Sequence, residues 1–480
     1  MEEAKHFIAG AWAPPAGGET IAVIDPSDGE PFARLARGTA PDVGAAVQAA
    51  RAAFDGSWGA LGAADRGRML YRLSMLVAAC REELALIESR DTGKPLTQAR
   101  ADADALARYL EFYAGAADKL HGETLPYRDG YTVLTLREPH GVTGHIVPWN
   151  YPMQILGRSV GAALAAGNAC VVKPSEDACL SILRVATLAA EAGLPEGAFN
   201  VVTGYGHEAG AALARHPGVD HLSFTGSPDT GRLVAQMAAE HHASVTLELG
   251  GKSPQIVFAD ADLDAALPVL VSAIVQNAGQ TCSAGSRVLI DKAVYEPLVE
   301  RLATAFNGLK VGPGRADLDC GPLINAKQQQ RVWDFLSDAQ HDGIAMAAHG
   351  QVVPDAPETG FYQAPALLRD VPHTHRLAQE EVFGPVLAAM PFADEDEALA
   401  LANGTPFGLV AGIWTRDGAR QQMRLARKVR AGQVFVNNYG AGGGVELPFG
   451  GTGRSGYGRE KGFEALYGFT VLKTIALRHG

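Results

Sequence analysis

The hydrophobic positions downstream of residue 140 form short continuous runs that alternate with longer segments of helical spacing. Such alternation is typical of a parallel sheet covered by helices on both faces. The predicted strands are 142–147, 169–173, 200–203 and 221–224, with helices at 153–166, 178–192, 208–215 and 230–241. After Glu248 a second series predicts strands at 256–258, 287–290, 411–414 and 433–436, and helices at 263–276 and 297–309. The pattern therefore predicts an α/β fold with two Rossmann-like parallel sheets and ligands at the carboxyl ends of their strands.

The N-terminal part is mostly helical in its spacing. The predicted elements are a short strand at 7–12 that turns at Gly10 and helices at 41–54, 64–86 and 96–120. Tyr109, Phe112 and Tyr113 form an aromatic stripe on the last helix, which we interpret as core. Two other stretches, 127–138 and 467–476, alternate apolar and polar residues as two-sided strands do. The first of them lies between two Rossmann-like segments, which is unusual for a strand of the core.

Composition restricts the function classes. The 480 residues are 47% hydrophobic and 20% charged, an ordinary globular mixture too long for one domain. The net charge of -12, without a Lys/Arg run, argues against nucleic acid or an anionic membrane as a partner. Five cysteines without a CxxC or a His/Cys cluster argue against disulfides and a metal site, and favour a reducing cytoplasm. The polar N-terminus is unlike a signal peptide, and the apolar run 265–275 is too short to span a bilayer.

Two glycine patterns are candidates for a phosphate-binding turn. Residues 204–210 nearly match a dinucleotide fingerprint but contain one residue too many, so a tight turn is the better interpretation. Residues 226–231 have the glycine spacing of a P-loop, yet Arg232 and Leu233 follow where Lys and Ser/Thr are required. A phosphate-hydrolysing function is therefore disfavoured.

Two stretches carry candidate groups for nucleophilic catalysis. One places the Glu248 carboxylate at a strand end beside two glycines, and the other places the Cys282 thiol on a short polar turn. A cysteine nucleophile needs a thiolate and a base that manages protons. With three further motifs, this pair resembles the aldehyde dehydrogenase superfamily, from residue 7 to the C-terminal strand. The five motifs are residues 148–152, 224–227, 247–252, 279–282 and 380–385.

The resemblance implies the aldehyde dehydrogenase fold, with two Rossmann-like domains and a small β extension for oligomerisation. It implies a dinucleotide-binding domain of residues 1–122 and 143–249, a catalytic domain of 250–446, and oligomerisation strands at 123–142 and 460–480. The implied partners are a small-molecule aldehyde and other copies of the chain, in a homodimer or homotetramer, without nucleic acid or membrane.

The resemblance also implies a reaction. Cys282 would attack the aldehyde carbon to form a thiohemiacetal, with the Asn150 side chain and the Cys282 backbone N–H as oxyanion donors. Loss of hydride would leave a thioester, which water activated by Glu248 would hydrolyse to the carboxylic acid. Relatives that pass the acyl group to coenzyme A lack this base. The alternative is therefore a coenzyme A-acylating or phosphate-dependent aldehyde oxidoreductase, and the three intact residues argue against a non-catalytic role.

The cofactor implied by the resemblance is NAD. The positions that match the family's dinucleotide site are Ile146, Trp149, Lys173, Glu176, Gly226, Ser227, Gly231, Glu381 and Phe383. A carboxylate at Glu176 accepts hydrogen bonds from a ribose 2′,3′-diol and repels a 2′-phosphate, so NAD is expected in preference to NADP. Glu176 also suits the N-terminal end of a helix, where it would interact with the helix dipole, and both interpretations can hold.

The aldehyde tunnel is expected along the helix after Asn150 and around the thiol. Its predicted lining is Tyr151, Ile155, Arg158, Thr281 and Ser283, with the glycine-rich stretch 440–446 as a further wall. Several relatives that take short polar or carboxylate-bearing semialdehydes have Arg at the position of Arg158, so we hypothesise a polar or anionic substrate tail. Gln276 stands where succinate-semialdehyde-type relatives place a second Arg, so the carboxylate interpretation is half supported. The alternative is that Arg158 forms a salt bridge within the fold.

Overall fold

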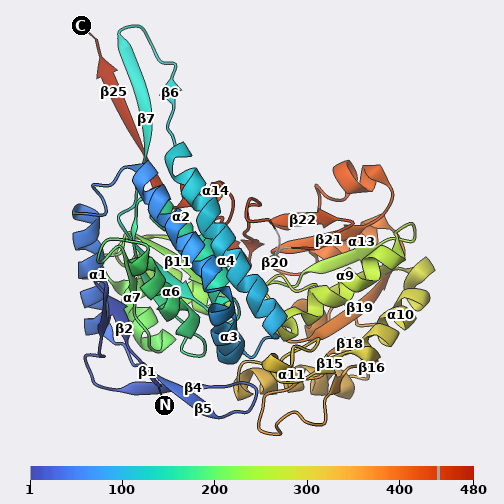
Figure 1. The fold of residues 1–480 in the computed structure, drawn as a ribbon. Helices are drawn as coiled ribbons and strands as arrows, with labels where there is room; N and C mark the ends of the chain where they lie inside the picture. The colour runs from blue at the N-terminus through green and yellow to red at the C-terminus, as the bar shows by residue number, and fades with distance from the viewer. Residues whose placement is uncertain (1, 441–443, 480) are drawn as a thin grey trace.

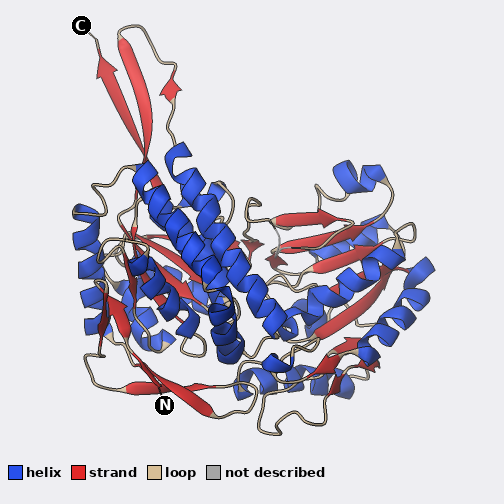
Figure 2. Ribbon diagram, in the orientation of Figure 1, coloured by secondary structure: helices blue, strands red, loops and turns tan. Residues whose placement is uncertain are grey.

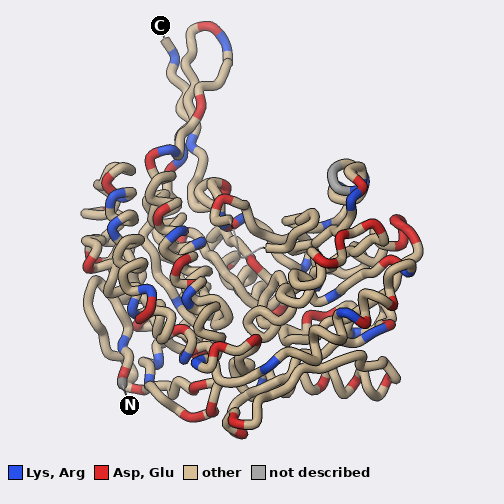
Figure 3. The backbone as a smooth tube through the Cα atoms, turned by 45° about the vertical axis from the view of Figure 1, so that its right-hand side comes forward, with Lys and Arg blue, Asp and Glu red and all other residues tan. Residues whose placement is uncertain are grey.

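Two α/β lobes lie side by side, and a thin arm of strands projects from the first (Figure 1). The computed structural model describes residues 2–440 and 444–479. Figure 2 shows helices packed around the sheet of each lobe, whereas the arm consists of strands alone. Acidic and basic positions are interspersed along the described chain (Figure 3). No helix of that part of the chain is long and apolar enough to cross a membrane.

The sheet of the first lobe has eight strands within the described residues. In spatial order they are β24 (Gly456–Tyr457), β12 (Ser244–Glu248), β11 (His221–Thr225), β8 (Val142–Val147), β9 (Ala169–Pro174), β10 (Phe199–Val201), β2 (His6–Ile8) and β3 (Ala11–Ala13). The strands from β12 to β10 run parallel. The intervening helices are α5 (Pro152–Ala166), α6 (Leu180–Glu191), α7 (Ala211–Arg215) and α8 (Pro228–Ala239), with α1 (Ala40–Asp55) preceding the arm. This order confirms the predicted alternation of strand and helix.

The second sheet has seven strands among the described residues. They are β16 (Met346–His349), β18 (Ala366–Leu368), β19 (Val386–Phe392), β14 (Arg287–Asp291), β13 (Pro254–Val257), β21 (Val410–Trp414) and β22 (Gln433–Val436), all parallel to their neighbours except β16. The helices α9 (Leu263–Val275), α10 (Tyr295–Gly308), α11 (Ala326–His341), α12 (Arg376–Gln379) and α13 (Glu395–Asn403) accompany it. Separate apolar clusters fill the two sides of this sheet. The predicted α/β class with two mainly parallel sheets is thus confirmed.

The helix predicted at 64–86 is two helices. The first, α2 (Ala63–Ala79), stops at Cys80, whose ψ of 15° leaves the helical range, and α3 (Arg81–Thr92) runs on to Gly93. Gly93 has a φ of 77°, a left-handed value that glycine adopts without strain. The helix α4 (Leu96–Ala116) follows, and Tyr109 and Tyr113 of the aromatic stripe are buried in the core as predicted.

Other boundaries also differ from the sequence pattern. The predicted strand at 7–12 is the hairpin of β2 and β3, and the helix predicted at 208–215 begins with one wide turn, Gly206–Gly210. The strand predicted at 467–476 starts later, because α14 (Glu464–Gly468) occupies its first residues. The strand itself, β25 (Thr470–Arg478), pairs along its length with β7 (Tyr131–Pro139), which replaces the predicted 127–138. With β6 (Thr124–Leu125), these two strands form the arm.

The glycine-rich segment 444–458 returns from the second lobe to the first. Its C-terminal part adds β24 to the first sheet, where Gly456 pairs with Glu248 at the end of β12. Gly456 has a φ of 101°, and a Cβ built on it would lie 2.0 Å from the carbonyl oxygen of Leu247, so only glycine fits this approach. The chain therefore returns from the second lobe to the strand end that carries Glu248.

Candidate active site

A cavity of about 1170 Å³ lies where the parallel strands of the first sheet end, and residues of the second lobe complete its wall. Glu248 is the last residue of β12, and Asn150 follows β8 by three residues. Both line this cavity together with Cys282, which lies on the turn after α9. The carboxyl ends of parallel strands are the expected place for a ligand, because loops diverge there and leave a crevice.

The turn before Cys282 has an unusual backbone. Asn277 and Ala278 have φ values of 50° and 53°, and Gly279 has a φ of 72°. A non-glycine residue in this region costs about 1–3 kcal/mol, so the surrounding contacts must hold the turn in place. Gln98 accepts a hydrogen bond from the Asn277 N–H at 2.8 Å, and Gln280 accepts one from the Ile324 N–H at 2.9 Å. The thiol is thus carried on a strained turn anchored to both lobes.

The two glycines after Glu248 are required by close neighbours. A Cβ on Gly251 would lie 2.5 Å from the carbonyl oxygen of Cys282, and a Cβ on Gly250 would lie 2.2 Å from Glu381 Oε2. The Gly251 N–H donates to Glu381 Oε1 at 2.9 Å. These glycines let the Cys282 turn and the Glu381 carboxylate approach the backbone at the end of β12.

Asn150 is held at both its backbone and its side chain. Its side-chain amide donates to the carbonyl oxygen of Gln280 at 2.9 Å, and its own carbonyl accepts from the Asn277 amide at 2.9 Å. One N–H of the Asn150 amide has no acceptor among the described residues. It is available for an oxygen that carries negative charge near Cys282.

Burial dominates the protonation of the two candidate reacting groups. It raises the pKa of the Cys282 thiol to about 12, against the opposing effect of Arg158. It also raises the pKa of Glu248 well above its usual value, with Glu460 adding to the effect and Arg158 opposing it. Neither carboxylate oxygen of Glu248 has a hydrogen-bond partner among the described residues. A carboxylate in this setting is a stronger base than one in water.

The predicted cofactor residues fall into two groups. Those that line the large cavity are Trp149, Gly226, Ser227, Glu381 and Phe383. The rings of Trp149 and Phe383 meet edge to face, with centroids 5.4 Å apart. Ser227 caps α8 by accepting the Thr230 N–H at 3.3 Å, so the helix N-terminus faces the cavity that Ser227 lines. Burial raises the pKa of Glu381 to about 7.

The other predicted cofactor residues are not among the lining residues of the large cavity; they are Ile146, Lys173, Glu176 and Gly231. Lys173 Nζ is 2.9 Å from Glu176 Oε2, an ion pair beside the carboxyl end of β9. Gly231 gives close packing of α8, because a Cβ there would lie 2.5 Å from the Leu249 side chain. Ile146 is partly buried against the core of the lobe.

All five predicted substrate residues line a second, narrow cavity of about 90 Å³. Cys282 and Asn150 belong to the walls of both cavities, so the thiol lies where they meet. Tyr151 Oη and Thr281 Oγ1 are 2.9 Å apart, and Tyr439 Oη donates to the Ser283 carbonyl at 2.5 Å. Gly440 contributes to this wall, whereas residues 441–443 of the predicted glycine-rich wall lie outside the described residues.

Arg158 lines the narrow cavity but is already paired. Its Nε is 2.5 Å from Glu460 Oε2, and the guanidinium lies 4.9 Å from the ring centroid of Phe449. Glu460 is fully buried and also accepts a hydrogen bond from Ser223 Oγ at 2.7 Å. Although burial alone would lower the pKa of Arg158, the Glu460 and Glu248 carboxylates raise it. Of the two interpretations left open by the sequence, the salt bridge within the fold is the one present.

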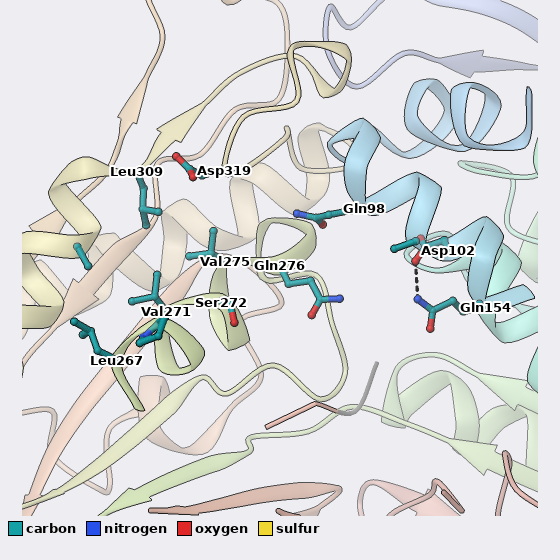
Figure 4. A pocket seen from close by; sticks show the side chains of 14 residues that line it. Gln98, Asp102, Gln154, Leu267, Val271, Ser272, Val275, Gln276, Leu309 and Asp319 are labelled. Carbon is teal, nitrogen blue, oxygen red and sulfur yellow. Dashed lines mark hydrogen bonds between the residues drawn. The ribbon is translucent and has the colours of Figure 1, made fainter. Parts of the chain in front are cut away.

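A third cavity, of about 730 Å³, lies between α4 and α9 (Figure 4). It shares Gln154, Ser272 and Gln276 with the narrow cavity, so the two cavities adjoin. Apolar side chains such as Leu267, Val271 and Leu309 form much of its wall. The charged residues of the lining are Asp102 and Asp319.

Comparison with known proteins identifies the family. The model of the aldehyde dehydrogenase family matches residues 12–475. The chain belongs to the aldehyde dehydrogenase family.

Relatives of known sequence or structure agree over nearly the whole chain. A hydroxyisobutyraldehyde dehydrogenase of Mycolicibacterium austroafricanum is 43% identical, over 98% of this chain and 93% of the relative. A crystal structure from Burkholderia cenocepacia, designated an aldehyde dehydrogenase, is 84% identical with a TM-score of 0.99, over 99% of this chain and 100% of that one. An NAD⁺ complex of a Bacillus cereus aldehyde dehydrogenase is 39% identical with a TM-score of 0.96, over 99% of this chain and 97% of that one.

Sequence reasoning did not find every residue that shapes this aldehyde dehydrogenase site. Glu460 is a single carboxylate in a glycine-rich segment, and nothing in its local sequence signals a partner 302 positions away along the chain. Gln280 lies within the cysteine motif and Asn277 two residues before it, so proximity alone could have suggested them. Lys94, whose ammonium donates to the Asn150 carbonyl at 2.9 Å, follows the helix break at Gly93 and carries no recognisable motif of its own.

Proposed function

We propose that this aldehyde dehydrogenase oxidises a short polar aldehyde to the free carboxylic acid through a covalent intermediate on Cys282, with NAD as the oxidant. The observation that carries the proposal is the position of Cys282 and Asn150 in the walls of both cavities. A large cavity of dinucleotide size thereby meets a narrow one of aldehyde size at a single thiol.

In the proposed reaction Cys282 gives up its S–H proton to solvent water, and its sulfur bonds to the aldehyde carbon. The free N–H of Asn150 stabilises the oxyanion that forms. The bound nicotinamide supplies the acceptor for the hydride that leaves this carbon, so a thioester remains on Cys282. Glu248 then takes a proton from the water that attacks the thioester, and the acid leaves as the thiol is restored. Its raised pKa makes the Glu248 carboxylate a stronger base toward water than an ordinary carboxylate.

The large cavity fits NAD. Ser227 at the N-terminus of α8 suits a pyrophosphate, because free N–H groups and the helix dipole favour an anion there. Trp149 and Phe383 offer ring faces and edges for the nicotinamide. The Lys173–Glu176 pair suits the ribose hydroxyls, and the Glu176 carboxylate would repel the 2′-phosphate of NADP. We therefore propose NAD in preference to NADP.

The substrate class follows from the narrow cavity. Tyr151, Thr281, Ser283 and Gln276 supply polar groups around it, whereas the charge of Arg158 is compensated by Glu460. A substrate carboxylate would have to compete with a buried, hydrogen-bonded glutamate for the same guanidinium. A short uncharged aldehyde with a hydroxyl group needs no such competition, and one relative is named for hydroxyisobutyraldehyde. The semialdehyde hypothesis thus stays a prediction that the ion pair weighs against.

The arm and the cysteines suggest the assembly and the compartment. The described β25 edge is long and exposes Val471, Leu472 and Leu477, a surface that in other proteins pairs with another chain. We propose a homodimer or homotetramer joined through this arm.

All five cysteines are described and are free thiols, which suits a reducing cytoplasm.

The products of a single incubation test the reaction class. With NAD, aldehyde and added coenzyme A or phosphate, we expect one free acid per NADH and no acyl thioester or acyl phosphate in solution. Formation of acyl-coenzyme A or acyl phosphate would instead support the alternative oxidoreductase on the same fold.

A panel of aldehydes tests the substrate class. At equal enzyme concentration, kcat/KM should be highest for short hydroxyaldehydes, lower for alkyl and aromatic aldehydes, and lower again for carboxylate-bearing semialdehydes. A clear preference for the carboxylate-bearing semialdehydes would contradict the interpretation that Glu460 compensates the charge of Arg158. The same panel with NADP should give lower kcat/KM values than with NAD.

A further inference from the structure

A lysine that lines none of the three cavities contacts the backbone of Asn150. Lys94 lies between α3 and α4 with 1% of its surface exposed. Its ammonium donates to the carbonyl oxygen of Asn150 at 2.9 Å and lies 4.4 Å from the ring centroid of Tyr151. A fully buried ammonium is costly unless carboxylates compensate it, so its place beside the site needs a reason.

Two buried carboxylates keep this lysine charged. Lys94 Nζ is 3.3 Å from Glu88 Oε1 and also donates to Asp102 Oδ2. Burial would lower the pKa of Lys94, but Asp102 and Glu88 together raise it above its usual value. Asp102 in turn accepts a hydrogen bond from the Gln154 amide at 2.6 Å. Glu88 and Asp102 therefore hold the ammonium from two sides, and its third hydrogen bond goes to the carbonyl oxygen of Asn150.

The contact bears on the orientation of the Asn150 side chain. Within the described residues, the one other donor to the Asn150 carbonyl besides Lys94 is the Asn277 amide, and Asn277 belongs to the strained turn with a φ of 50°. A charged donor makes a shorter and stronger hydrogen bond than a neutral one. Because the peptide plane of Asn150 sets the direction of its Cα–Cβ bond, a fixed carbonyl also fixes the amide that faces Cys282.

We propose that Lys94 is a positioning residue that holds Asn150 in the orientation needed to stabilise the oxyanion on the Cys282 adduct. It acts through Asn150 and does not touch the thiol or the substrate cavity. The inference rests on the proposed function, because it requires Asn150 to be the oxyanion donor. It also explains why a compensated triad of Glu88, Lys94 and Asp102 is buried next to the site rather than replaced by apolar side chains.

The test is a double-mutant cycle on the NADH burst, which reports formation of the thioester. Removing Lys94 alone would leave buried carboxylates unpaired, so the variant is Lys94→Met with Asp102→Asn. Burial already raises the pKa of Glu88 to about 7, so Glu88 becomes neutral readily once Lys94 is gone and keeps its hydrogen bond from Ser181. The matched control is Asp102→Asn alone, which retains the Lys94–Asn150 contact.

The variants are compared in two backgrounds, wild type and Asn150→Ala, at saturating NAD and aldehyde. In the wild-type background we expect the burst rate constant to fall about 10–100-fold for Lys94→Met/Asp102→Asn, somewhat less than removing an oxyanion donor outright. Asp102→Asn alone should stay within about threefold of wild type. In the Asn150→Ala background the loss of Lys94 should lower the burst rate constant by less than about threefold. Lys94 acts through the Asn150 side chain, so its effect should largely disappear when that side chain is absent.

Equal losses in both backgrounds, or no loss in either, would overturn the role of Lys94 while leaving the proposed function intact. An unchanged burst in Asn150→Ala itself would overturn both, because Asn150 would then not be the donor. If the paired variant does not fold, Lys94→Arg keeps the charge opposite the two carboxylates but cannot place a single donor in the same position. It should show the same dependence on Asn150, with a loss of about 3–10-fold.

Discussion

Burial acts on Cys282 and Glu248 in the same direction. The pKa of each is raised, so the thiol and the carboxyl group both favour their protonated forms in the absence of other charges. Arg158 opposes the shift at both groups and is itself held by Glu460. The protonation of both groups therefore depends on the Arg158–Glu460 pair as well as on burial.

Glu248→Gln separates the two halves of the reaction. We expect a burst of NADH of near wild-type amplitude and a steady-state rate lower by about 10²–10⁴-fold, because the amide cannot take the proton of water. In the wild type, steady-state turnover should rise with pH through a pKa above the usual carboxylic value, since the base form accumulates only as pH passes the raised pKa. Stopped-flow and steady-state assays across pH measure both.

The control for this experiment is Glu300→Gln, which changes an exposed carboxylate on α10 that is not among the lining residues of the three cavities. It should leave both phases unchanged. A Glu248→Gln enzyme that keeps the wild-type steady-state rate and pH profile would remove Glu248 from the deacylation step.

Arg158 and Glu460 form a buried pair whose two members depend on each other. Arg158→Met should lower the free energy of unfolding by about 3–5 kcal/mol, because the buried Glu460 charge loses its partner. Adding Glu460→Gln should restore most of this loss. Chemical denaturation of the single and double variants measures the effect, and a single variant as stable as the wild type would show that the pair is not formed in solution.

At the scale of elements, the end of β12 is the point of closest approach. The turn that carries Cys282, the Glu381 carboxylate and the returning strand β24 all lie against residues 247–251. Glycine is thus required in this segment because the approaching residues leave no room for a Cβ atom. The sequence pattern alone places these glycines near a strand end but does not say which segments come close.

Gly250→Ala should weaken NAD binding. The new Cβ would lie 2.2 Å from Glu381 Oε2, so the carboxylate must move from the position it takes beside the Gly251 N–H. We expect the KM for NAD to rise about tenfold, the equivalent of one lost charge-assisted hydrogen bond, with a smaller change in the KM for aldehyde. The control is Gly17→Ala, where no atom lies within 4 Å of the added Cβ. Equal NAD constants in the two variants would contradict the prediction.

The elements themselves were largely predictable because their signal is local. Apolar runs and helical spacing locate the strands and helices of both lobes within a few residues. The break at Cys80 was not predictable, since the apolar spacing continues through it and only the packing of α2 and α3 on α4 requires two directions. The start of β25 was missed because α14 is too short to show a helical period.

The site was predictable to the extent that family motifs mark it. The motifs led to Cys282, Glu248 and Asn150, to five residues of the narrow cavity, and to five of the nine predicted cofactor residues in the large cavity. Glu460 and Lys94 were not found, because each acts through a partner distant in sequence and neither belongs to a local pattern. The sequence shows the charge of Arg158, but only the structure shows that Glu460 pairs with it.

At the scale of the whole molecule, the arm is the feature that a single chain leaves incomplete. Its strands project beyond both lobes (Figure 1), and β25 carries exposed apolar residues along an edge. A chain that exposed such an edge on its own would risk non-specific pairing, so burial against another copy is the expected outcome.

Leu472→Lys combined with Leu477→Lys should reduce the mass of the assembly measured by sedimentation. Two charges on an apolar contact disfavour its burial, and the burst amplitude per chain should remain because the site is distant from the arm. Met346→Lys is the control, since Met346 is 48% exposed on the edge strand β16 of the second lobe. An unchanged mass for the arm variant would place the subunit contact elsewhere.

The raised pKa of Cys282 has a consequence outside turnover. A neutral thiol reacts slowly with peroxides and alkylating reagents, because the thiolate is the reactive species. In the absence of substrate the raised pKa of Cys282 thus protects its sulfur from these reagents. Its resistance to oxidation should therefore rest on the burial that keeps the thiol protonated.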